Sequence, residues 1–195
     1  MIESLLSVKE EADGNLRVTL LLEGEKKKKK TVTVPREDYI EAGAPKAGDR
    51  MHKDDLAILL RESEKQDALN RAFAILAASD NSASALYKKL TLRGFSRNAA
   101  VHAVESLIAR GYLSDKEQLS RYVPELATRK LYGKRRLVAE LMKKGYRRAN
   151  IEEAIADTEQ SGSLDFSTLR DMLLSQIPAD ATAEERRALL YKNGF

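Results

Sequence analysis

One motif occurs three times in this chain, and it constrains the fold more than any other feature. The motif is Leu-x3-Leu-x3-Gly followed by an aromatic residue, and its copies end at Phe95, Tyr146 and Phe195. The first two copies lie 51 residues apart and the third lies 49 further on, where only the second leucine, the glycine and the aromatic residue are kept. Self-similarity at such a period is typical of arrays whose neighbouring units bury a shared core. The sequence therefore predicts repeats of about 50 residues.

The motif has a direct physical interpretation as a packed helix end. Leu137 and Leu141, four residues apart, share one face of a helix. Gly145 ends that helix in a left-handed conformation that other residues adopt only at a cost. Tyr146 then packs back on the last turn, as in helix-stop motifs. We therefore expect three helices per unit, with a long first helix, the motif on the second, and the third beginning after the aromatic residue.

Polar residues predict where these helices begin, and one proline predicts an interruption. Ser82, Ser96 and Ser114 precede helical periods and are expected N-caps. Pro124 is expected to kink or split its helix. The helix after Ser96 is expected to bury Ala100, Val101, Val104, Leu107 and Ile108.

The first 53 residues follow a different period. Apolar residues alternate over 16–22, which is typical of a half-buried strand, and Asp13-Gly14 predicts a hairpin with a preceding strand. The β-branched stretch 31–34 predicts a third strand, so a small sheet of three or four strands is expected. The five lysines at 26–30 favour an exposed edge strand protected by charge. DNA tethering is the alternative for these lysines.

Together these patterns predict a mainly α protein. Tandem three-helix repeats form an elongated array behind a small N-terminal β-rich domain. Tryptophan is absent and aromatic residues are only 6%, which favours helices packed through Leu and Ala. The expected divisions are 1–53 for the β-rich domain, 54–112 for a first repeat with a long leading helix, 113–162 for the second repeat, and 163–195 for an incomplete third.

Several function classes find no support in the sequence. Cysteine is absent, so there is no thiol nucleophile, disulfide or Cys-ligated zinc. His52 and His102 have no evident metal partners and are expected to be ordinary surface or half-buried histidines. No Gly-rich phosphate loop or nucleophile elbow occurs. We expect no enzymatic activity, catalytic residue, cofactor or metal. The acidic N-terminal segment is not a signal peptide, and no run spans a membrane, so a cytoplasmic protein without a membrane partner is expected.

Positive charge is concentrated in one third of the chain. Residues 84–148 hold 16 Lys and Arg against 5 Asp and Glu, a net +11, whereas the whole chain carries only +4. This asymmetry predicts a polyanionic or acidic partner. The main candidate binding residues, opposed within their own segment only by Glu140, are Arg129, Lys130, Lys134, Arg135, Arg136, Lys143, Lys144, Arg147 and Arg148. The equivalent place in the first unit holds Lys88, Lys89, Arg93 and Arg97. The alternative is a solvated helix face with one ion pair, Glu140 to Lys144.

Four tyrosines lie among these basic residues. Tyr112, Tyr122, Tyr132 and Tyr146 stand near expected helix ends, several of them beside glycine. That placement favours packing anchors. Stacking on nucleic-acid bases is the alternative.

Three stretches resemble the RecX family, the bacterial regulators of the RecA recombinase. They are SASALYKKLTLRGFS at 82–96, ARGYLSDKEQLSRYV at 109–123 and LYGKRRLVAELMKKGY at 131–146. The resemblance runs from about residue 64 onward. It implies an all-helical array of three three-helix units that binds along the RecA filament on DNA. It also implies inhibition of recombinase and co-protease activity in DNA repair, recombination and the SOS response.

The residues alone leave other functions open. A stand-alone DNA-binding helical-repeat protein is one alternative, and an inert helical scaffold is another. The repeat argues against a lone helix-turn-helix, and the basic excess argues against an inert scaffold. Filament capping, monomer stripping and groove blocking are all compatible with the sequence. We expect a monomer that contacts DNA through the filament or directly.

Overall fold

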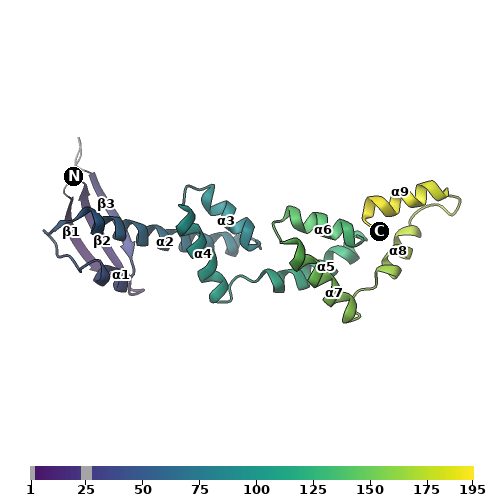
Figure 1. Cartoon of the computed structure of the whole chain (residues 1–195), viewed down its shortest axis with the longest axis horizontal. Coiled ribbons are helices and arrows are strands. Elements are labelled where there is room, and N and C mark those ends of the chain that lie inside the picture. Colours follow the sequence, from purple (N-terminus) through teal and green to yellow (C-terminus); the bar gives the residue numbers. More distant parts are fainter. Residues whose placement is uncertain (1–2, 23–27) are drawn as a thin grey trace. The chain divides into compact units, whose positions relative to one another are not determined.

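The computed structural model describes residues 3–22 and 28–195, and its backbone is mainly helical with a small N-terminal sheet (Figure 1). The strands are β1 (Glu3–Glu10), β2 (Leu16–Leu22), β3 (Lys28–Val34) and β4 (Arg50–Met51). The helices are α1 (Arg36–Glu41), α2 (Lys53–Ala78), α3 (Ala83–Thr91), α4 (Arg97–Ala109), α5 (Asp115–Lys130), α6 (Lys134–Lys143), α7 (Arg148–Gln160), α8 (Phe166–Leu174) and α9 (Ala183–Asn193).

The chain divides into two compact units. The first unit comprises Met1–Ala78 and Tyr87–Arg110, and the second comprises Ser79–Leu86 and Gly111–Phe195. Helix α3 therefore begins in the second unit and ends in the first. The mainly α class with an N-terminal sheet is confirmed. The division into a β-rich domain and three repeats, and their elongated arrangement, stay predictions.

The N-terminal sheet is antiparallel, with the strand order β3-β2-β1-β4. Leu16, Val18 and Leu20 are buried, as the alternation in β2 predicted. They pack with Leu56 and Leu59 of α2, which closes the core of this sheet. Alternate residues of β2 and one face of α2 thus pack together in one apolar layer.

The lysine run falls partly within the described residues. Lys28–Lys30 open β3, which among the described strands pairs only with β2 and so forms an edge of the sheet. Lys29 and Lys30 are exposed. The edge-strand prediction is confirmed for these residues, whereas Lys26 and Lys27 lie outside the described residues.

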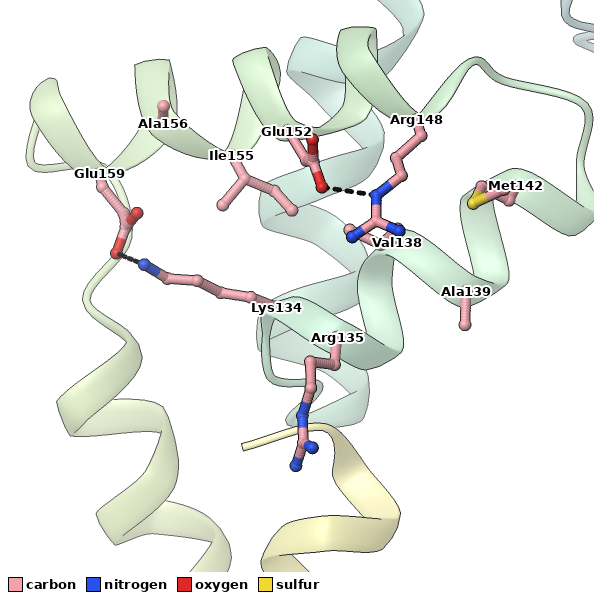
Figure 2. A pocket seen from close by; sticks show the side chains of 10 residues that line it. All are labelled: Lys134, Arg135, Val138, Ala139, Met142, Arg148, Glu152, Ile155, Ala156 and Glu159. Carbon is pink, nitrogen blue, oxygen red and sulfur yellow. Dashed lines mark hydrogen bonds and ion pairs between the residues drawn. The ribbon is translucent and has the colours of Figure 1, made fainter.

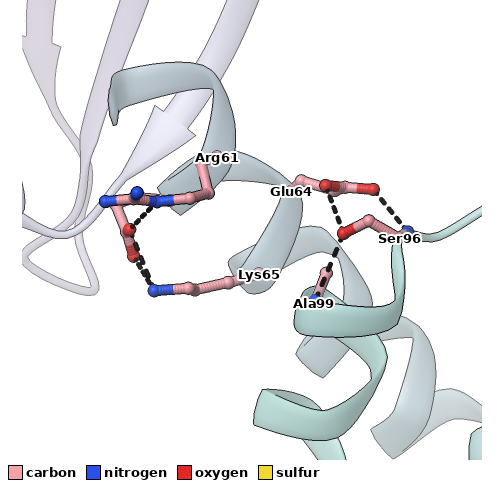
Figure 3. Close-up of polar contacts among 6 residues, drawn as sticks. Arg61, Glu64, Lys65, Ser96 and Ala99 are labelled. Atoms are coloured by element: carbon pink, nitrogen blue, oxygen red, sulfur yellow. Dashed lines mark hydrogen bonds and ion pairs between the residues drawn. The ribbon is translucent and has the colours of Figure 1, made fainter. Parts of the chain in front are cut away.

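Helix α4 is capped by a serine that also contacts α2. The Ser96 Oγ accepts a hydrogen bond from Ala99 N at 3.3 Å, which is the expected N-cap geometry (Figure 3). The Glu64 carboxylate of α2 accepts bonds from Ser96 N at 2.7 Å and from Ser96 Oγ at 2.8 Å. One acidic side chain on α2 therefore orients the beginning of α4.

The buried face of α4 differs from the expected one. Val101 is 39% exposed and Ile108 is 49% exposed, so their predicted burial is wrong. The buried residues are Ala99, Ala100, Ala103, Val104 and Leu107. Small alanines let two helix backbones approach closely, so the alanine face lies toward α2, and Val101 and Ile108, seven residues apart, share the outer flank.

The repeated motif has the same backbone geometry at all three sites. Gly94 and Gly145 both have φ +92°, and Gly194 has φ +84°. The aromatic amide donates back to the carbonyl five residues earlier, as in a Schellman helix end. These bonds are Phe95 N to Leu90 O at 3.4 Å, Tyr146 N to Leu141 O at 3.2 Å, and Phe195 N to Leu190 O at 3.0 Å. The predicted helix-end geometry is confirmed at each copy.

The end of α6 lies against the beginning of α3 within the second unit. Ser82 Oγ caps α3 by accepting from Ala85 N at 3.2 Å, and it donates to Lys144 O at 2.9 Å. A Cβ on Gly145 would lie 2.7 Å from Ser82 Oγ. The glycine is therefore needed for close approach as well as for its backbone angle.

The end of α9 lies against the beginning of α6 in the same way. Gly133 N, at the N-cap of α6, donates to Asn193 O at 2.7 Å, and Arg135 N donates to Gly194 O at 3.2 Å. Ser82 and Gly133, which donate the hydrogen bonds at the two helix beginnings, are 51 residues apart. One joint thus occurs twice, in which a helix C-terminus supplies carbonyl acceptors to a helix N-terminus.

Helix α5 runs without a break through Pro124, so the predicted split is wrong, while a kink at this position stays a prediction. Proline removes one backbone donor from the helix interior. Leu119, Val123 and Ala127, which precede and follow Pro124 in the sequence, are fully buried in one core cluster. Ser114 caps α5 as expected, because its Oγ accepts from Glu117 N at 3.2 Å.

Candidate functional site

The nine basic residues of the second unit come from the end of α5, from α6 and from the beginning of α7. Leu137 and Leu141 of α6 are fully buried, which turns the basic positions of this helix outward. Eight of the nine basic residues are exposed, and Arg136 is half-buried. Their contact with a partner stays a prediction.

Carboxylates neutralise more of this surface than the sequence indicated. The prediction that Glu140 alone opposes these cations is wrong for the folded chain. Five of the nine cations form ion pairs: Arg129–Glu125 at 3.3 Å, Lys134–Glu159 at 2.7 Å, Arg136–Glu140 at 2.9 Å, Lys143–Glu140 at 3.1 Å and Arg148–Glu152 at 2.7 Å. Glu152 and Glu159 lie on α7, outside the basic segment but beside it in space.

The predicted ion pair between Glu140 and Lys144 is replaced by other contacts. The Glu140 carboxylate contacts Arg136 and Lys143 instead. Lys144 Nζ lies 5.6 Å from the centroid of the Tyr122 ring on α5. A cation–π contact with the neighbouring helix thus replaces the local helical pair.

Arg135 and Arg136 take part in the joint between α6 and α9. The Arg135 guanidinium donates to Phe195 O and lies 5.0 Å from the Tyr191 ring centroid. The Arg136 guanidinium lies 5.4 Å from the Tyr132 ring, and its buried Nε has no hydrogen-bond partner among the described residues. The contacts of these two arginines therefore stabilise the fold, in addition to adding positive charge to the surface.

Lys130 and Arg147 differ from the paired cations. Both are exposed, and neither forms an ion pair within 3–22 and 28–195. Lys130 ends α5, and Arg147 immediately precedes α7. An anionic partner could therefore bind Lys130, Arg147 and Lys144 without breaking an ion pair within the protein.

The four basic residues of the first unit lie around the end of α3. Lys88 and Lys89 occupy its last turn, Arg93 follows it, and Arg97 begins α4. Lys88, Arg93 and Arg97 are exposed, while Lys89 is half-buried. Arg93 Nη1 donates to Lys89 O at 2.9 Å. A role in binding stays a prediction for these residues.

Sequence reasoning missed a hollow between α6 and α7 (Figure 2). Its volume is about 590 Å³. The apolar part of its lining is Val138, Ala139, Met142, Ile155 and Ala156. The charged part is Lys134, Arg135, Arg148, Glu152 and Glu159. The available signal was the presence of apolar residues at outward positions of an otherwise basic helix.

Two of the four tyrosines contact each other and form hydrogen bonds within the second unit. Tyr146 is buried and donates to Gln118 Oε1 at 2.6 Å, and burial raises the pKa of Tyr146. Tyr122 donates to Asp80 Oδ2 at 2.9 Å. The two rings meet edge to face with centroids 6.2 Å apart. Tyr122 and Tyr146 are therefore packing anchors, as predicted.

The other two tyrosines differ from each other. Tyr132 is partly buried against the same core as Tyr146, which confirms a packing role. Tyr112 is 63% exposed, so its predicted role as an anchor is wrong. It follows Gly111 in the connection between α4 and α5, which leaves most of its side chain in solvent.

His52 and His102 are exposed, in line with ordinary surface histidines. Among the described residues, no group of His, Asp or Glu is arranged to hold a metal ion. No helix in that part of the chain combines the length and apolarity needed to cross a membrane.

A curated protein and two solved structures that resemble this chain are all RecX proteins. No family model matches the chain. A curated relative, Regulatory protein RecX of Caldanaerobacter subterraneus subsp. tengcongensis (strain DSM 15242 / JCM 11007 / NBRC 100824 / MB4), is 27% identical over 132 residues. That alignment covers 68% of this chain and 66% of the relative, slightly less than two thirds of the relative's length.

Two solved structures share the fold. A crystal structure of regulatory protein RecX matches with a TM-score of 0.71 at 15% identity, covering 99% of this chain and 94% of that one. RecX from Lactobacillus salivarius matches with a TM-score of 0.56 at 18% identity, covering 68% and 88%. Fold and surface thus define a helical protein with an N-terminal sheet and a basic face. The chain is thus similar in sequence to a regulatory RecX protein, and it shares the fold of two solved RecX structures.

Proposed function

We propose that this chain regulates the RecA recombinase by binding the RecA filament on DNA and inhibiting its recombinase and co-protease activities. The observation that carries the proposal is the exposed basic face on α5, α6 and α7, in a chain similar to regulatory RecX proteins. In this role the protein is non-enzymatic and acts in the cytoplasm, in DNA repair and the SOS response.

The distribution of ion pairs determines which cations contribute most. Positive side chains favour binding to a polyanion because they displace the counterions condensed on it. They also raise the rate at which the two molecules associate. A cation already paired with a carboxylate gains less, since the existing pair must be given up or shared. Lys130, Lys144 and Arg147 are therefore expected to contribute more than Lys134, which is paired with Glu159.

The test is RecA-dependent ATP hydrolysis on single-stranded DNA with and without the protein. The site variant combines Lys130→Glu, Lys144→Glu and Arg147→Glu. Its matched control combines Arg170→Glu, Arg187→Glu and Lys192→Glu, three exposed residues of α8 and α9 that undergo the same change of charge. Arg135 is left intact because its guanidinium contacts the end of α9, and Arg136 because it pairs with Glu140 and lies beside the Tyr132 ring.

We expect the parent and the control to inhibit hydrolysis, and the site variant to need at least about tenfold more protein, since removing available cations weakens polyanion binding. Equal loss in both variants would mean that only total charge matters. Parent protein that binds naked DNA as tightly as filaments, without affecting RecA, would favour the stand-alone DNA-binding function.

A further inference from the structure

We propose that the outward face of the N-terminal sheet binds the phosphate backbone of a single-stranded nucleic acid. The outward face is the side of β1, β2, β3 and β4 turned away from α2, and these strands belong to the first unit. The inference goes beyond the proposed function, because it assigns a nucleic-acid contact to a part of the chain that the filament proposal does not use.

The strand register determines which side chains share the outward face. Successive side chains of a strand point to opposite sides, and Val18 and Leu20 of β2 are buried against α2. The residues between and beside them, with their cross-strand partners, therefore point outward. They form three rows across the sheet, which are Arg50–Ser4–Leu21–Lys29, Ser7–Thr19–Thr31 and Lys9–Arg17–Thr33.

The three rows carry positive charge and contain no acidic residue. Lys9, Lys29 and Arg50 are exposed, and none of them forms an ion pair within 3–22 and 28–195. Arg17 pairs with Glu11, which follows β1 directly. Residues 1–53 hold 11 Lys and Arg against 10 Asp and Glu, so composition does not account for a face without acids. The fold has separated the charges by position.

Protection of a sheet edge does not account for this charge either. Lysines on an edge strand prevent pairing with other chains, which explains Lys29 on β3. Lys9 and Arg17 lie on β1 and β2, and each of these strands has a described strand on both sides. Cations on inner strands of an open face are explained by an anionic ligand.

The hydroxyl groups of the middle row favour phosphate as that anion. The Oγ1 atoms of Thr19 and Thr31 lie 3.5 Å apart, and Ser7 is the cross-strand partner of Thr19. Hydroxyl and cationic side chains are common donors to phosphate oxygens. The rows contain no aromatic residue, which is the typical anchor of a protein interface and the usual platform for base stacking. Binding is therefore expected to be independent of base sequence.

The shape of the face favours a single strand over a duplex. A β-sheet is twisted, and a flexible single strand can follow that twist from one row to the next. Duplex DNA is stiff over a length as short as this sheet, so it touches a twisted surface along one line.

The test is an NMR titration of the isotope-labelled full chain with a short oligothymidylate, in the absence of RecA. The comparison probes are a DNA duplex of the same length and a polyglutamate peptide. The face variant combines Lys9→Glu with Lys29→Glu. Its matched control combines Arg71→Glu on α2 with Arg110→Glu at the end of α4, two exposed residues that also form no ion pair with a described residue. A hydroxyl variant, Thr19→Val with Thr31→Val, keeps the charge.

The oligothymidylate is expected to shift the amide signals of Ser7, Thr19 and Thr31. The face variant should bind it at this site at least about tenfold more weakly, and the slope of log K against log salt should fall by about 1.4, since each phosphate contact to a single strand contributes about 0.7. The control should bind as the parent does. The hydroxyl variant should bind about fivefold more weakly with an unchanged slope.

The proposal is wrong if the oligothymidylate shifts signals of the second unit only, or if the face and control variants lose equal affinity. Equal shifts with polyglutamate would assign the face to an acidic protein, and equal shifts with the duplex would overturn the assignment to a single strand. The signals of the buried residues Val18 and Val32 report whether each variant keeps the fold, and the parent titration alone locates the site. Because RecA is absent, the result is independent of filament inhibition.

Discussion

Gly145 shows how one residue serves both a helix end and a joint. Its φ of +92° lies in the left-handed region, and a Cβ would meet Ser82 Oγ at 2.7 Å and Ala85 N at 3.3 Å. Gly94 has the same φ of +92°, but a Cβ on it would meet no other described part of the chain within 4 Å. The two glycines therefore separate backbone strain from close contact.

We predict that Gly94→Val lowers the free energy of unfolding by about 1–3 kcal/mol, because a β-branched residue is held in a left-handed turn. Gly145→Val should cost more, since Ser82 must also move and its bond to Lys144 O is lost. Denaturant unfolding of both variants measures the difference. Equal costs would show that the contact with Ser82 contributes nothing.

At the scale of elements, the joint between α6 and α9 can be tested at Gly133. Its φ is −76°, which alanine adopts freely, so the backbone itself tolerates substitution. A Cβ would overlap Gly194 O and approach Phe195 N to 2.7 Å. The cost of Gly133→Ala therefore comes from the joint alone.

We predict that Gly133→Ala loosens α9 and reduces the protection of its amides in hydrogen exchange by an amount equivalent to about 1–3 kcal/mol, the usual cost of overpacking. Amides of α4, in the other unit, serve as the internal reference and should not change. Unchanged protection of the α9 amides would mean that the hydrogen bonds from the beginning of α6 do not stabilise α9.

The beginning of α8 is expected to depend on pH. Asp165 caps this helix, and hydrogen bonds from Thr168 and Ser167 lower the pKa of its carboxyl to about 2. A lowered pKa stabilises the fold above the ordinary value of 3.8, and the contribution is lost as the pH falls through about 2. The protection factors of the Ser167 and Thr168 amides, taken relative to the intrinsic exchange rate at each pH, should therefore decrease as the pH falls from 3.8 to about 2. Asp165→Asn, which cannot titrate, should remove this dependence.

At the scale of the whole molecule, the 51-residue repeat predicts an elongated array, because each unit contacts only its neighbours. A compact globule of this length has a radius of gyration of about 16 Å. We predict a clearly larger value by small-angle X-ray scattering of the monomer. A value at the compact limit would contradict the array, whereas a concentration-dependent value would indicate self-association.

Much of the fold followed from local rules. The caps Ser82, Ser96 and Ser114 and the helix end at Gly145 were predictable because they depend on residues within one helical turn. The buried face of α4 was less predictable, because Ala100, Ala103 and Val101 are all apolar. Close packing against α2 selected the alanine face.

The candidate site was predictable as a concentration of charge but not as a set of available cations. Lys130 and Arg147 form no ion pair with any described residue, while Lys134 is paired with Glu159, 25 residues away in the sequence. A tally along the chain counts only residues close in sequence. Coulomb attraction depends on distance in space, so α7, packed beside α6, decides which cations remain available.

The helical class, the helix ends and the concentration of positive charge follow from the amino-acid order, because backbone sterics and composition act locally. Only the packing of the helices brings Gly145 against Ser82 and Arg135 to the end of α9, and leaves a hollow between α6 and α7. Each of these features joins residues from different helices. Steric exclusion and pairing between such residues exist only once the helices have packed.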